Sequence, residues 1–192
     1  IMGSSNTIES ATLENNAAGV ATSIVGVANV ANNANGALIF GAGNEISNSI
    51  TDIDVPQDST ISSAKALQTK LMDAIKSSNS GGSTMVMGGG NKADYTQLSS
   101  VIGVNNTLSG TSDDISTYNY VSGFNNTASN VDNVTVIGRN RTVTGADSSI
   151  VIGRADSAIE TTASDAVAIG RNTNVTIDGG TALGLNSIAS VD

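Results

Sequence analysis

A short apolar run that ends in glycine recurs along the whole chain, and this repeat constrains the fold more than any other feature of the sequence. The closing glycines are mostly 14 to 17 residues apart, and they are Gly3, Gly26, Gly41, Gly88, Gly103, Gly123, Gly138, Gly153, Gly170 and Gly184. A period of this length is typical of a stacked β-solenoid, in which one repeat cannot bury its inner side chains alone. We call one such repeat a coil.

Each coil is expected to hold two short strands joined by a tight turn. The residue before the glycine is apolar in nine of the ten coils, with Ser122 as the exception, and the residue five positions after it is apolar in all ten, Ala158 included. The residue three positions after the glycine is Asn6, Asn29, Asn44, Asn91, Asn106 and Asn126, then Arg141, Asp156, Thr173 and Ser187. Because glycine and asparagine tolerate a positive φ, we expect both to be structural turn positions. The prediction is an all-β parallel β-roll (a β-solenoid) of about ten short coils, with residues 1–192 as one segment.

The first strand of each coil is apolar on both of its faces. The residue two positions before the glycine is also apolar in every coil. It points away from the face that carries Ile137, Ile152 and Ile169, because side chains alternate across a strand. One face can fill the interior, whereas the other would form an apolar stripe whose burial amounts to about 10 to 30 kcal/mol per chain. We expect that stripe to be buried against sister chains under cyclic symmetry, although the pattern leaves the number of chains open.

Composition argues against several classes of protein. The chain has no Cys, no His and no Trp, which removes disulfides and thiolate metal sites. Its net charge of −9 would repel nucleic acid and anionic lipid. Neither a membrane-spanning run nor a calcium-binding nonapeptide is present, so we expect no direct membrane insertion, no bound metal and no cofactor. The repeat runs into both ends, as in a segment cut from a longer protein.

The repeat is interrupted between residues 47 and 83. This excursion contains the only proline, and apolar residues then follow at helical spacing, which predicts an amphipathic helix over 61–77. Asp58, Ser59 or Thr60 can cap its start, and the segment Asn79-Ser80-Gly81-Gly82 can end it. We expect the helix to fold against the flank of the rod. A protruding recognition element is the alternative.

Catalysis is not expected, because no acid, base or nucleophile converges at matching positions of successive coils. Arg139, Arg154 and Arg171 follow the glycine in three successive coils, so stacking would set them in a column about 4.8 Å apart. We consider them candidate ligand contacts for an acidic group, together with Tyr118 and Tyr120. The competing interpretation is pairing with Asp147, Asp156 or Asp165 across coils or chains.

The repeats that end at Gly138, Gly153 and Gly170 resemble the S-V-A-I-G head repeat of trimeric autotransporter adhesins, the YadA-like head. The resemblance is strongest over 84–192. It implies a left-handed parallel β-roll with three chains per head. It also implies a location on the outer membrane of a Gram-negative bacterium, anchored through a part of the protein absent from this chain.

From this resemblance we expect a homotrimeric cell-surface adhesin head. It would attach by multivalent contacts to host extracellular matrix, host cells or other bacteria. One alternative is a structural spacer of a surface fibre. A further alternative is a trimeric, tailspike-like protein that binds or hydrolyses glycans.

Overall fold

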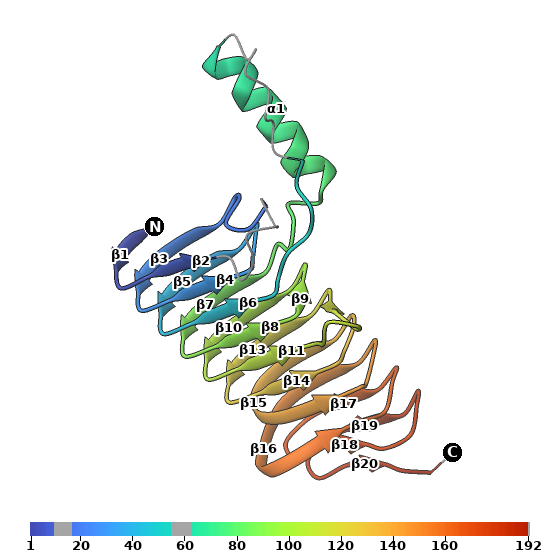
Figure 1. Ribbon diagram of the computed structural model, residues 1–192. Helices are drawn as coiled ribbons and strands as arrows, with labels where there is room; N and C mark the ends of the chain where they lie inside the picture. Colours follow the sequence, from blue (N-terminus) through green and yellow to red (C-terminus); the bar gives the residue numbers. More distant parts are fainter. Residues whose placement is uncertain (10–16, 55–62, 192) are drawn as a thin grey trace.

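The chain forms a long, parallel, solenoid-like rod from which one helix projects (Figure 1). The computed structural model describes residues 1–9, 17–54 and 63–191. Nearly every strand pairs in parallel with its counterpart one repeat away, so the predicted all-β parallel fold is confirmed at this level.

The first strands of the coils form one side of the rod, which we call side A. Equivalent glycines pair with one another, as in Gly103 with Gly123 and Gly123 with Gly138. The strands of side A are β1 (Met2–Ser4), β3 (Ser23–Val27), β5 (Leu38–Ala42), β7 (Met85–Gly89), β10 (Ser100–Val104), β13 (Tyr120–Phe124), the starts of β15 (Thr135–Thr144) and β16 (Ile150–Thr161), β17 (Val167–Ile169) and β19 (Thr181–Leu183).

The second strands form side B, and β15 runs continuously from one side to the other. The strands of side B are β2 (Thr7–Glu9), β4 (Val30–Asn32), β6 (Glu45–Ser47), β8 (Lys92–Asp94), β11 (Thr107–Ser109), β14 (Thr127–Ser129), the ends of β15 and β16, β18 (Asn174–Val175) and β20 (Ile188–Ala189). A third side carries the short pair β9 (Thr96–Gln97) and β12 (Ser116–Thr117).

The interior is filled by small aliphatic side chains in columns. The residue two positions before each glycine points inward from side A, and Val101, Val121 and Val136 are completely buried there. The residue five positions after the glycine points inward from side B, as Leu108 does. The prediction for Ala158 was wrong. This residue is exposed, because extra residues at its corner shift the register.

The six asparagines expected in the turn have a different role. None of them has a positive φ, and five of the six are buried. The Asn106 side chain shows the pattern: its Nδ2 donates to Asn91 Oδ1 (3.1 Å) and to the Gly123 carbonyl (2.9 Å), while its Oδ1 accepts from the backbone N of Asn126 (3.1 Å). The column is therefore an internal hydrogen-bonded ladder. The positive φ of the turn falls one residue earlier, as at Asn105.

The repeated glycines lie at the end of the side A strands and not in the turn itself. From Gly26 to Gly153 they belong to strands, and Gly170 and Gly184 directly follow β17 and β19. All have positive φ, and a Cβ on Gly123 would lie 1.8 Å from the Gly138 carbonyl oxygen. The repeat keeps glycine here because the backbones of adjacent coils approach too closely for any side chain.

The helix α1 (Ala64–Ser77) projects from the rod, so the expectation that it folds against the flank was wrong (Figure 1). None of its residues is buried, and Leu67 and Met72 are each 44% exposed. The observed N-cap is Ser63, whose side chain accepts from Ala66 N. The predicted caps at 58–60 and the predicted first helical residues, 61 and 62, lie outside the described residues. The end of the helix at residue 77 agrees with the prediction.

The buried side chain of Asn35 joins both ends of the excursion to the rod, and Gln97 Nε2 adds a hydrogen bond to the Ile50 carbonyl (2.9 Å). Asn35 Oδ1 accepts from the backbone N of Gly82 (2.7 Å) and of Thr51 (3.1 Å), and Asn35 Nδ2 donates to the Thr51 carbonyl (2.5 Å). Thus the outgoing and returning segments are fixed at the same point.

Candidate functional site

The outward surface of side A is apolar. Several of its large side chains are exposed in the single chain, with Phe40 53%, Phe124 49% and Ile169 39% accessible. We call this surface the apolar face. The outward surface of side B carries threonine and serine in β11, β14 and β15, such as Thr107, Thr127 and Thr142, and charged residues in other strands, such as Glu45 and Lys92; we call it the polar face.

All four arginines of the chain lie within 33 residues, at Arg139, Arg141, Arg154 and Arg171. They sit at the corner where side A meets side B. Arg139 is in register with Arg154. The backbone N of Asn172, which follows Arg171, donates to the Arg154 carbonyl (2.9 Å), so Arg171 lies next in the column. On a chain with a net charge of −9, this clustering makes one corner of the rod locally cationic.

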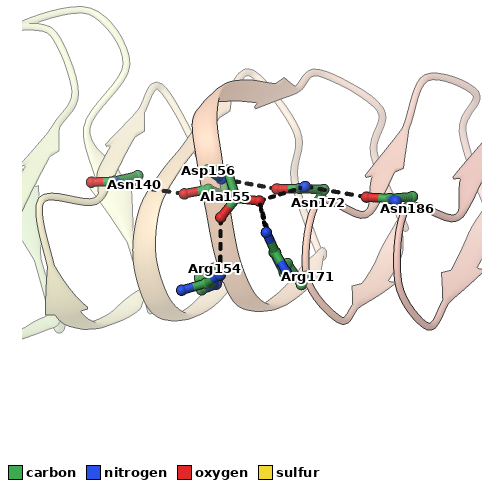
Figure 2. A network of polar contacts seen from close by, with 7 residues as sticks. All are labelled: Asn140, Arg154, Ala155, Asp156, Arg171, Asn172 and Asn186. Carbon is green, nitrogen blue, oxygen red and sulfur yellow. Dashed lines mark hydrogen bonds and ion pairs between the residues drawn. The ribbon is translucent and has the colours of Figure 1, made fainter.

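Asp156 lies between two of these arginines (Figure 2). Its Oδ1 is 3.2 Å from Arg154 Nη2, and its Oδ2 accepts from Arg171 Nε (2.7 Å) and from Asn172 Nδ2 (2.9 Å). The hydrogen bonds from Arg171 and then Asn172 lower the pKa of Asp156. Exposed ion pairs add little to stability, so the main effect of this network is to hold the three charged groups in place.

Arg139 differs from the other two arginines of the column. It is exposed, and its side chain makes no hydrogen bond or ion pair with any residue in the described ranges. Its guanidinium is therefore available to an external anion.

The corner is widened in the coil that contains Asp156. Arg139 and Arg141 are two residues apart in β15, but their partners Arg154 and Ile159 are five residues apart in β16, so three extra residues bulge outward. The bulge forms one wall of an open depression of about 330 Å³. Its lining residues are Asn125, Thr127, Asn140, Thr142, Asp156, Ser157 and Ala158.

Arg141 lies on the inner side of the same corner and is completely buried. It occupies the next position of the asparagine ladder, where its backbone N donates to Asn126 Oδ1 (3.1 Å). Its Nη2 reaches past the widened coil to the Thr173 carbonyl (2.8 Å), whereas Nε and Nη1 have no partner. Burial lowers the pKa of Arg141, but a guanidinium remains charged at neutral pH. A buried cation with no counter-ion among the described residues thus lies behind the depression.

The structure does not bring the predicted tyrosines to this corner. Tyr120 begins β13, at the opposite end of the strand from Phe124, which pairs with Arg139. It lies on the apolar face, 39% exposed, and Tyr118 precedes it with a positive φ of 58°. Of the three aspartates predicted as possible partners, Asp156 pairs with the arginines. Asp147 instead accepts from the backbone N of Asp132.

Sequence reasoning did not identify Arg141 or the residues of the depression as functional. The signals for them were the arginine that interrupts six asparagines and the 17-residue spacing after Gly153. Within the described ranges, no cluster of three acidic residues could hold a metal ion, and no helix is long and apolar enough to cross a membrane. No family model, curated protein or solved structure matched the chain.

Proposed function

We propose that this chain is the adhesive head segment of a trimeric bacterial surface fibre, of the YadA-like type that its repeats resemble. In this proposal the rod is left-handed and has ten coils. Three chains are joined along their apolar faces, and the fibre is anchored in the outer membrane by a part of the protein outside this chain. The head acts by binding to host matrix, host cells or other bacteria, without catalysis.

The single observation that supports this proposal is the contrast between the two outward surfaces. Exposed Phe40, Phe124 and Ile169 form part of a stripe that runs along the rod, and such a stripe is usually covered by another chain. The polar face would remain accessible in the assembly. Three copies of that face could combine many weak contacts, so that avidity exceeds the affinity of any one contact.

The oligomeric state can be tested by light scattering with a pair of matched variants. Ile137→Asp places a charge on the apolar face, and Thr107→Asp places the same charge on the polar face, where Lys92 is the neighbouring residue. We expect a trimer for the wild type and for Thr107→Asp, and dissociation for Ile137→Asp. A monomeric wild type would contradict the proposed assembly.

Adhesion can be tested with the same preparation against matrix proteins, host cells and neighbouring bacteria. A second form, in which residues 54–79 are replaced by a glycine–serine linker, removes α1 but keeps the residues bonded to Asn35. Binding that depends on α1 would assign the adhesive site to the excursion, and binding that persists would assign it to the rod. A trimer that binds no surface would favour a spacer of the fibre.

A further inference from the structure

We propose that the depression at the widened corner binds one acidic pyranose unit of a glycan, with its carboxylate directed toward Arg139 and Arg154. This inference deepens the proposed function and rests on it, because it names the ligand class of an adhesive site on the rod. It is carried by three independent observations: the shape of the corner, the chemistry of its lining and the charge around it.

The size and accessibility of the depression suit a single sugar ring. Its volume of about 330 Å³ is at the lower end of the range for small-molecule sites. It opens on the corner next to the polar face, where Thr127 and Thr142 point outward from side B. Thr127 and Thr142 would therefore stay accessible when the apolar faces are covered by sister chains, whereas Arg139 and Arg154 are in register with Phe124 and lie at the border of the covered face.

The lining favours a ligand rich in hydroxyl groups. Two amides (Asn125 and Asn140) and three hydroxyls (Thr127, Thr142 and Ser157) can each donate and accept hydrogen bonds, as sugar hydroxyls do. The amides are preorganised, because Asn125 Nδ2 donates to Asn140 Oδ1 (3.1 Å) and Asn140 Nδ2 donates to the Ala155 carbonyl (3.3 Å). Apart from the threonine methyls, the only apolar side chain of the lining is that of Ala158, so an apolar peptide anchor would find little to pack against.

The charge of the corner favours an acid over a neutral sugar. Asp156 is the one carboxylate in the lining, and it is already engaged by Arg154, Arg171 and Asn172. Arg139 has no partner among the described residues and precedes Asn140 of the lining. A ligand carboxylate can therefore form a charge-assisted pair with Arg139 without breaking an existing one.

Two further charges set the orientation of the sugar. Glu160 is exposed and pairs in register with Thr142, so it lies on the side B end of the depression and would repel an acid there. Arg141, whose Nε and Nη1 have no partner, lies on the inner side between the lining residues Asn140 and Thr142. Glu160 thus directs the carboxylate away from the side B end, and Arg141 makes the floor of the depression favourable to an anion.

The direct test is a titration of the chain with matched sugars, followed by saturation-transfer NMR. The probes are the methyl glycosides of glucuronic and galacturonic acid and of their neutral counterparts, glucose and galactose. We expect at least one acid to bind with a dissociation constant on the order of 1 mM, about tenfold more tightly than its neutral partner. Failure of both acids to bind, or equal binding of acid and neutral forms, would overturn the proposal.

Variants locate the site. Arg139→Gln should reduce the preference for the acid at least about fivefold, while binding of the neutral sugar stays the same, because only the charge-assisted pair is lost. Thr142→Val should weaken both sugars. Thr107→Val, the same change at the equivalent position outside the depression, should weaken neither. Equal effects of the two valine variants would place sugar binding elsewhere, and thermal unfolding of each variant checks that its fold is retained.

The titration uses no cells, so its failure is distinct from failure of the proposed function. If the chain binds cells but no acidic sugar, the proposed sugar site is refuted and the proposed adhesive function stands. Acidic pyranoses occur on host surfaces and on bacterial surfaces, so the bound sugar is also added as a competitor to both adhesion assays. The assay that it inhibits identifies the source of the glycan, and inhibition of neither would show that the depression is not the adhesive site.

Discussion

Substitution of Asn106 by alanine tests whether the asparagine ladder joins one coil to the next. The side chain is completely buried, and four of its hydrogen bonds connect it to Asn91, Gly123 and Asn126. At about 1 kcal/mol per hydrogen bond, and with the backbone N–H of Asn126 left buried without an acceptor, we expect a loss of about 3 to 5 kcal/mol in the free energy of unfolding. Asn105→Gly is the control, because Asn105 is exposed and glycine keeps its positive φ.

Hydrogen–deuterium exchange is the appropriate assay, because solenoid proteins open locally between neighbouring coils. A loss of about 4 kcal/mol corresponds to roughly a thousandfold faster exchange at the amide of Asn126. The amides of distant coils, such as that of Ile24, should change much less. If Asn106→Ala accelerated exchange no more than Asn105→Gly did, the ladder would not be a major source of cohesion between coils.

Three further outcomes are expected. Gly123→Ala should prevent correct stacking and lower the free energy of unfolding, measured by thermal unfolding, by more than about 3 kcal/mol. Gly145→Ala, with nothing within 4 Å of the new Cβ, should lower it by only about 1 to 2 kcal/mol. Similar losses for the two variants would contradict the close approach of the coils. Asn35→Ala should speed proteolysis within 47–83 without lowering the unfolding midpoint of the rod by more than a few degrees, and unchanged cleavage would show that Asn35 does not fix the base. Carboxyl NMR should give Asp156 a titration midpoint below its ordinary 3.8, because its arginine and asparagine partners favour the carboxylate. Its stabilisation is then complete above the unfolded pKa and is lost as the pH falls through the lower, folded pKa; a midpoint at or above 3.8 would contradict the network.

The parallel stacking was predictable because it depends on a pattern that many coils repeat, so that no single residue decides it. Any one apolar pentapeptide is a weak signal, but glycines such as Gly123, Gly138 and Gly153 recur 15 residues apart, and inward positions before and after them recur in phase. Backbone pairing between equal repeats follows from that regularity alone. The exposed apolar face followed from the same pattern, because two consecutive positions were apolar and only one could point inward.

The role of the asparagines, the register at Ala158 and the position of α1 could not be predicted, because each depends on individual tertiary contacts. An asparagine suits a positive φ and also a hydrogen-bonded ladder, so the pattern could not show which role Asn106 has. The extra residues after Gly153 could have been placed at any corner of the coil, and the register that exposes Ala158 is a tertiary result. The amphipathic pattern of α1 predicted a helix but contains no information about what its apolar side contacts.

The way in which the excursion joins the rod makes the two parts separable units of evolution and engineering. Gly41 and Gly88 are 47 positions apart in the sequence, yet they are direct neighbours in register, just as Gly26 and Gly41 are at a separation of 15. The contacts with the rod are concentrated at the base of that segment, where Thr51 and Gly82 meet at Asn35 and the Ile50 carbonyl accepts from Gln97 Nε2 (2.9 Å), whereas α1 has no buried residue. A foreign peptide or a small domain with closely spaced termini could be grafted between those ends, and the rod would display it laterally at a fixed height along its axis.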